Sequence, residues 1–316
     1  MKTSILIHPE ELSKTWIDRM VDCGITTLGL HPEGSKNAIN SLQALLERMQ
    51  SQEYRNLIDY AKDRGLQVNY ELHAMGYLLP RDLFDTHPEY FRMDENGNRV
   101  NDLNLCPSNQ AALKLVADNA VLLASQLYGS GNTYFFWLDD ARQGLCQCEK
   151  CRSLSASDQQ LLVVNAMAKA LREKDPQAKM AYLAYFDALQ LPQQVTKEAG
   201  VFLEYAPMDK WNIRYRQSEK ITAGAVLEQQ MCKPLLDFFG REDSVVLEYW
   251  IDNSMFSNWK KPPKKLCCDG AEAKRDVAYY LETGYENISV FGCFLGPDYE
   301  ALHGAPDIKP MTDSFK

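Results

Sequence analysis

The feature that most constrains the fold of this chain is a regular alternation of short apolar runs with amphipathic helical segments. The expected strands cover residues 4–8, 25–31, 66–73, 132–138, 178–186, 201–205, 244–250 and 288–294. The expected helices cover residues 11–23, 37–64, 110–128, 158–174, 192–199, 223–239 and 272–283. Eight strands that alternate with helices over about 290 residues predict an α/β fold, namely a single (β/α)8 TIM barrel over residues 1–316.

A doubly wound open sheet is the main alternative to the barrel. Such a fold commonly carries a glycine-rich phosphate-binding turn after its first strand, and no such turn follows residues 4–8. The segment after residue 294 shows little helical pattern, so we expect the last helix of the barrel to be irregular or missing.

Composition narrows the range of partners and locations. The formal charge is 34 − 43 = −9 without a basic run, which disfavours a nucleic-acid partner. No stretch approaches the roughly 20 apolar residues of a membrane span. The nine cysteines are clustered and odd in number, which favours a metal site over a disulfide framework and indicates a cytoplasmic location.

Polar and aromatic side chains gather at the predicted strand ends, where TIM barrels place their active sites. The candidate substrate-binding residues there are His8, His31, Glu71, His73, Trp137, Glu204, Tyr205, Tyr249 and Trp250, with Trp211 in a polar loop. Aromatic rings can stack on the apolar faces of sugars, and polar groups can bind sugar hydroxyls. The pattern therefore predicts a carbohydrate as substrate or ligand, while any single member could equally be a core residue or a solvated strand end.

A cysteine cluster follows the fourth predicted strand. Cys146, Cys148 and Cys151 lie within six residues, a spacing that lets thiolates surround one soft metal ion. Cys106 follows the third strand, whose end is adjacent to the end of the fourth in a barrel, and is the expected fourth ligand. We therefore predict a structural zinc ion on four cysteines, with four buried cysteines as the alternative reading.

The cysteine region resembles the cysteine-cluster β-galactosidases. The shared features are residues 104–109 (Asn-Leu-Cys-Pro-Ser-Asn), a helix, an aromatic strand that ends in acids, and the Cys-x-Cys-x-x-Cys triplet. In that family four such cysteines hold a structural zinc, and the strand before the triplet ends in Asn-Glu, with the glutamate as acid/base. The matching pair here is Asp139-Asp140, which departs from the family at both positions.

The chain is still more similar to a bacterial family of glycosidase-like barrels defined as a domain of unknown function. Residues 70–190 carry this resemblance, through His73, Pro80 and residues 87–91, 96–99 and 105–109 together with the cysteine triplet. The resemblance implies a glycoside-hydrolase-like barrel and leaves the sugar open.

Glycoside hydrolysis commonly uses two carboxyl groups, and the sequence permits two arrangements. In a double displacement, Asp140 after strand four is the acid and Glu248 at the end of strand seven is the nucleophile. In a substrate-assisted N-acetylhexosaminidase, Asp139 orients the acetamido group of the sugar and Asp140 is the acid. A non-catalytic carbohydrate-binding barrel is the alternative to both.

Overall fold

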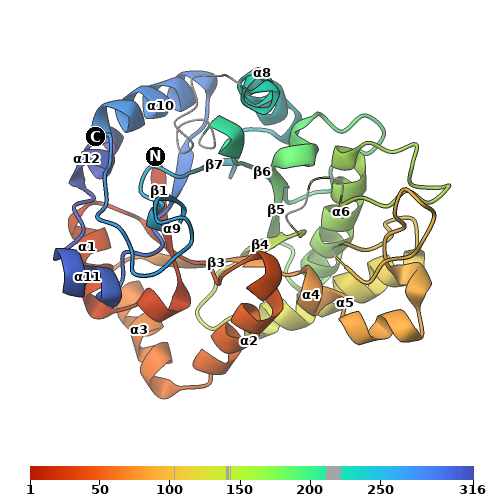
Figure 1. Ribbon diagram of the computed structural model, residues 1–316, viewed down its shortest axis with the longest axis horizontal. Helices are drawn as coiled ribbons and strands as arrows, with labels where there is room; N and C mark the ends of the chain where they lie inside the picture. The colour runs from red at the N-terminus through yellow and green to blue at the C-terminus, as the bar shows by residue number, and fades with distance from the viewer. Residues whose placement is uncertain (103, 140–141, 143, 211–221) are drawn as a thin grey trace.

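Eight parallel strands close into one barrel in chain order, with β1 paired to both β2 and β8 (Figure 1). The computed structural model describes residues 1–102, 104–139, 142, 144–210 and 222–316. The strands are β1 (Lys2–Ile7), β2 (Thr27–Leu30), β3 (Gln67–His73), β4 (Thr133–Trp137), β5 (Lys179–Ala184), β6 (Val201–Tyr205), β7 (Val245–Glu248) and β8 (Asn287–Phe291). This topology confirms the predicted (β/α)8 TIM barrel.

Helices surround the barrel, and several begin and end where the sequence signals predict. The longer ones are α1 (Lys14–Asp22), α2 (Ala38–Arg48), α3 (Gln52–Asp63), α5 (Gln110–Gln126), α6 (Ala156–Lys174), α8 (Ala223–Phe239) and α10 (Gly270–Thr283). Short helices are α4 (Met75–Leu78), α9 (Asn253–Phe256), α11 (Pro297–His303) and α12 (Lys309–Thr312), so the last βα unit ends irregularly, as expected. Asn109 and Ser155 cap α5 and α6 through their side-chain oxygens. None of the helices in the described part of the chain is long and apolar enough to cross a membrane.

Two predicted helices differ from the structure. The predicted helix over residues 37–64 is interrupted, because Ser51 accepts a hydrogen bond from the Tyr54 backbone and begins α3 as a new helix. The predicted helix over residues 192–199 is wrong. There the backbone N–H groups of residues 193, 194 and 195 all donate to Asp158 Oδ1, at 2.9 Å each, and this side chain replaces the partners that a helix would supply.

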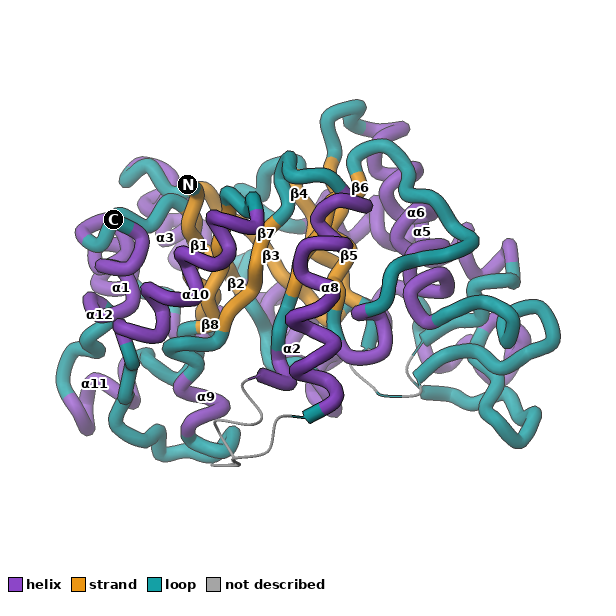
Figure 2. The backbone as a smooth tube through the Cα atoms, turned by 90° about the horizontal axis from the view of Figure 1, so that it is seen from above, coloured by secondary structure: helices purple, strands orange, loops and turns teal. Residues whose placement is uncertain are grey.

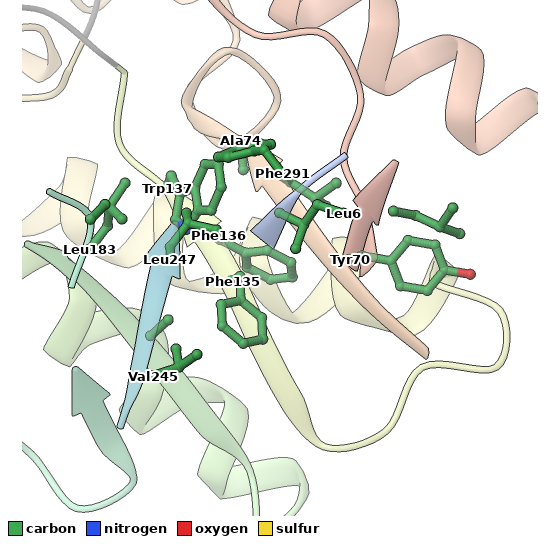
Figure 3. Close-up of a cluster of buried hydrophobic side chains, with 14 of the residues drawn as sticks. Leu6, Tyr70, Ala74, Phe135, Phe136, Trp137, Leu183, Val245, Leu247 and Phe291 are labelled. Carbon is green, nitrogen blue, oxygen red and sulfur yellow. The ribbon is translucent and has the colours of Figure 1, made fainter. Parts of the chain in front are cut away.

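The two-residue period of the strands decides which side chains enter the barrel. Leu247 lines a cavity at the carboxyl end of the strands and Val245 lines one at the opposite end, so their neighbours Val246 and Glu248 face the helices. Figure 3 shows members of the apolar core gathered from several strands. In Figure 2 the N-terminus lies at the top of the barrel and α9 lies at the bottom. The bottom of this view is therefore the mouth, where the carboxyl ends of the strands lie.

Candidate active site and metal site

The four predicted cysteines meet in one buried cluster beside the barrel mouth. The Sγ atoms of Cys106, Cys146, Cys148 and Cys151 all lie within 4.8 Å of one another. Cys106 Sγ lies 3.7 Å from Cys148 Sγ and 3.8 Å from Cys151 Sγ. A tetrahedral ion with metal–sulfur bonds of about 2.3 Å separates its sulfurs by about 3.8 Å, so the spacing fits such an ion. These four cysteines could hold a metal.

The residues around the cluster match the requirements of charged thiolates. The backbone N–H of Met93 and the guanidinium of Arg99 lie 3.3 and 3.7 Å from Cys146 Sγ, both as donors. Gln159 holds the loop in place: its side chain accepts from the Cys146 backbone and donates to the carbonyls of Cys146 and Cys151. Donors to sulfur and an anchored backbone are typical of the surroundings that tune and orient metal ligands.

A cavity of about 460 Å³ opens at the barrel mouth. Its lining includes five of the predicted substrate-binding residues, which are His8, His31, His73, Trp137 and Tyr249. The residues that sequence reasoning missed are mostly loop residues and include Glu33, Tyr185, Asp252, Trp259 and Phe294. The volume lies within the range of small-molecule sites. The strand ends therefore form a real pocket.

Two of the histidines are held in a defined tautomer. His8 Nδ1 lies 2.8 Å from the carbonyl of His31, and His31 Nδ1 lies 2.9 Å from the carbonyl of Glu71. A carbonyl only accepts, so each Nδ1 carries a proton, and Nε2 is the acceptor wherever the ring is neutral. Burial, with the charges of His73 and His8, lowers the pKa of His31 well below its usual range. His31 is therefore a neutral hydrogen-bonding group.

Aromatic rings form the walls and rim of the mouth cavity. The ring of Trp137 lies 5.3 Å from that of His31 and 5.1 Å from that of His73, and Tyr249 stacks on Phe291 at 5.2 Å. Trp259 lines the same cavity but is 59% exposed, which places a large flat ring at the entrance. The cavity therefore combines apolar flat surfaces with polar groups such as His8, His31 and Asp252.

Asp252 supplies a carboxyl group to the mouth cavity from the segment after β7. It is buried, and its Oδ1 accepts from the Ser254 hydroxyl at 2.6 Å and from the backbone of Ser254 and Met255. Burial raises the pKa of Asp252, while these hydrogen bonds and the nearby His8 act in the opposite direction. The sequence signal that could have found it is the cap position before α9.

Asp139, the described member of the predicted acidic pair after β4, lies beside this cavity. Asp139 lines a smaller cavity of about 50 Å³ that shares Leu183 and Tyr185 with the mouth cavity. Its Oδ2 lies 3.0 Å from the guanidinium of Arg81. Asp140 and Trp211, the other candidates in this region, lie outside the described residues.

The structure corrects the expected orientation of three strand-end residues. Glu248 faces the helical layer, where its carboxylate binds Lys210 Nζ at 2.7 Å and accepts from the Tyr280 hydroxyl. Trp250 donates to Asp276 at 3.0 Å, and Tyr205 donates to a carbonyl of α8. Their orientation follows from strand alternation, because their neighbours 204, 247 and 249 point inward.

Glu71 and Glu204 lie inside the barrel, below the mouth cavity. Both are buried, and Trp137 Nε1 donates to Glu204 Oε2 at 2.6 Å. Burial raises the pKa of both carboxyl groups, for Glu204 to about 8. The predicted substrate-binding role of these two residues would therefore be exerted through the tryptophan.

Several solved structures are similar to this chain in fold. A structure described as a glycoside hydrolase matches with a TM-score of 0.58 and 13% identity over 99% of this chain and 98% of that chain. The β-galactosidase from the psychrophilic Marinomonas ef1 matches with a TM-score of 0.53 and 14% identity, over 92% of this chain and 54% of its own. CpGH89 from Clostridium perfringens, in complex with its substrate GlcNAc-α-1,4-galactose, matches with a TM-score of 0.53 and 11% identity, over 99% of this chain and 37% of its own.

At such low identities, these structural matches show a shared barrel fold alone. No curated protein matches the sequence. A family model, described as "Domain of unknown function (DUF4838)", matches residues 39–230. That match spans more than half of the chain and includes β3 to β6, the acidic pair and all four clustered cysteines. The chain is therefore a member of the DUF4838 family, on a barrel shared with glycoside hydrolases.

Proposed function

We propose that this protein is a glycoside hydrolase that binds its sugar in the mouth cavity. The observation that carries the proposal is the cavity itself: about 460 Å³ at the carboxyl ends of barrel strands, with aromatic walls and a neutral histidine. An uncharged ring with hydroxyl groups fits this lining, because aromatic faces contact its C–H surfaces and histidine nitrogens accept from its hydroxyls.

Two carboxyl sources flank the cavity in the proposed reaction. The loop after β4 supplies Asp139 and Asp140, and we assign Asp140 as the acid that protonates the leaving oxygen. Asp252, on the β7 side, replaces Glu248 as the second carboxyl group, but as a base and not as the nucleophile of a double displacement. Its raised pKa suits a general base, which would activate the water that attacks the anomeric carbon.

The substrate-assisted mechanism is a second candidate, and one contact favours it. Asp139 is fixed by Arg81, and in that mechanism the residue at this place orients an acetamido group instead of transferring a proton. Asp140 remains the acid. Only 2-acetamido sugars would then be cleaved, and Asp139→Ala would abolish turnover more completely than Asp252→Asn.

The cysteine cluster fits a structural zinc ion. Four buried sulfurs at this spacing would complete a tetrahedral coordination and would leave no position for water. Cys106, Cys146, Cys148 and Cys151 would hold the zinc, and its role would be to fix the loops that carry the acidic pair.

A panel of aryl glycosides that differ in sugar and anomer tests the proposed activity. The parent protein should cleave at least one of them. Asp140→Asn should slow natural glycosides by about 100-fold or more while sparing activated aryl leaving groups, which need little protonation. Binding of sugars without cleavage of any would support the carbohydrate-binding alternative instead.

A further inference from the structure

A pair of buried carboxyl groups lies in the barrel interior beneath the mouth cavity. Glu71 comes from β3 and is 1% exposed, and Glu204 comes from β6 and is 0% exposed. Glu71 also lines a separate cavity of about 80 Å³ toward the amino ends of the strands. Two acids in a barrel core are costly to bury unless each has a defined partner.

The contacts of the pair account for only part of the hydrogen bonding that two buried carboxyl groups require. Trp137 Nε1 donates to Glu204 Oε2 at 2.6 Å, which accounts for one oxygen. Among the described residues, no donor reaches Glu204 Oε1 or Glu71 Oε2, although both atoms are buried. The two carboxyl groups lie within hydrogen-bonding reach of each other. Since ionised carboxylates only accept, a proton on one of them is required to join them.

The surroundings of the pair contain few other charges. Lys2 and Asp243 line the lower cavity together with Glu71, and Asp243 is paired with Lys179. Above the pair, His31 and His73 contact the ring of Trp137. The effects on the pKa values of the pair come from burial, from each other and from the indole of Trp137.

We propose that protonated Glu71 donates to Glu204, and that Glu204 in turn fixes the indole of Trp137 as the floor of the sugar site. Glu71 and Glu204 are positioning residues in this arrangement, since both act on the ligand through Trp137. The reference to a sugar rests on the proposed function, whereas the hydrogen-bonded chain of three groups does not.

The direction of the pKa shifts agrees with this order of groups. Burial raises the pKa of Glu204 to about 8, while the hydrogen bonds from Trp137 and Glu71 act to lower it. Burial and the neighbouring Glu204 raise the pKa of Glu71 well above the usual range, so Glu71 keeps its proton when Glu204 ionises. Ionisation of Glu204 strengthens the bond that it accepts from the indole.

Nuclear magnetic resonance of the full chain with 15N-labelled tryptophan tests the proposal. Trp137→Phe assigns the indole signal of Trp137 among the five tryptophans. That signal should move downfield as pH rises, with a midpoint near pH 8, the pKa of Glu204. The indole of Trp16 donates to the carbonyl of Leu295 at 3.0 Å, so its signal should stay in place and serves as the internal control.

Two variants of Glu71 separate positioning from a merely structural role. Glu71→Gln keeps a donor to Glu204 and should retain the midpoint of the parent protein. Glu71→Leu removes the donor and should raise the midpoint by about one pH unit or more. A Trp137 signal that does not titrate, or equal midpoints for the two variants, would overturn the proposal. Neither result depends on whether any glycoside is cleaved.

Discussion

The cysteine cluster and the mouth cavity lie on the same end of one barrel, yet they are built in opposite ways. Three of the four cysteines lie within residues 146–151, and the cluster is closed, buried and complete in itself. The cavity is lined by residues of β3, β4, β5, β7 and β8 and by segments that follow the strands, including those after β1 and β2. The first region is suited to hold structure, and the second is open to a ligand.

This difference explains why the cysteine cluster could be predicted from the sequence more completely than the lining of the cavity. Spacing along the chain defines the cysteine triplet, and the adjacency of the third and fourth strands adds Cys106, so neither step required the orientation of a strand residue. Whether a strand residue lines the cavity depends on the side of the strand from which its side chain projects. A shift of one residue along the strand reverses that side. Glu248 and Tyr249 are neighbours, but only Tyr249 lines the cavity.

Loss of the proposed zinc ion should be the largest effect and should appear in stability. Cys148→Ser should eliminate bound zinc and lower Tm by about 10 °C, because closed metal sites contribute folding free energy. Metal analysis and thermal unfolding measure both quantities. The matched control is Cys267→Ser, at an exposed thiol outside the cluster, which should change neither. Full zinc content in Cys148→Ser would contradict the role of this ligand.

Breaking the ion pair behind β7 should also reduce stability. Glu248 is fully buried and binds Lys210, which also binds Asp276 at 2.8 Å, so Glu248→Leu removes one of two carboxylates from the ammonium and should cost about 2 kcal/mol of unfolding free energy. Chemical denaturation measures the change. Lys114→Leu, which removes an exposed ion pair with Asp118, should change the free energy by less than about 0.5 kcal/mol. Similar values for the two variants would show that the Glu248 pair is not buried in solution.

Stability should fall as pH rises through the range set by Glu204. The folded pKa of about 8 exceeds the ordinary value of 4.5, so the folded state binds more protons between these values than the unfolded state. The stability that the protonated Glu204 side chain contributes is complete below pH 4.5 and is lost as pH approaches 8. Glu204→Gln should flatten the dependence of unfolding free energy on pH in this window. An unchanged slope would contradict the burial of this carboxyl group.

The smallest effect should come from the rim of the cavity. Trp259 is 59% exposed, so Trp259→Ala should leave Tm unchanged while it raises KM about fivefold, equivalent to about 1 kcal/mol. Leu302→Ala, at another exposed apolar residue on α11, should alter neither quantity. If Trp259→Ala keeps the KM of the parent protein, Trp259 does not contact the sugar.

The barrel and the metal cluster could be predicted because both follow from repeated local patterns. Alternating strands and helices specify the barrel, and Gly24 and Gly65 end their helices with φ angles of +77° and +89°, as expected at helix ends. Asp252 and Trp259 were missed because they enter the cavity from the segment after β7, where no strand pattern applies, and only Asp252 carries a local signal, its cap position before α9. The false helix over residues 192–199 arose because the contact with Asp158 spans over thirty residues of sequence.

The central claim is that chemistry occurs in the mouth cavity and not behind β7. The most direct test is the turnover per folded molecule of Asp252→Asn and Glu248→Gln on an aryl glycoside that the parent cleaves. Asparagine retains the oxygen that caps α9, so Asp252→Asn should fold normally and lose about 100-fold or more in turnover. Glu248→Gln should stay within about threefold of the parent once corrected for folding. The reverse result, a silent Asp252 variant and an inactive Glu248 variant, would contradict the account.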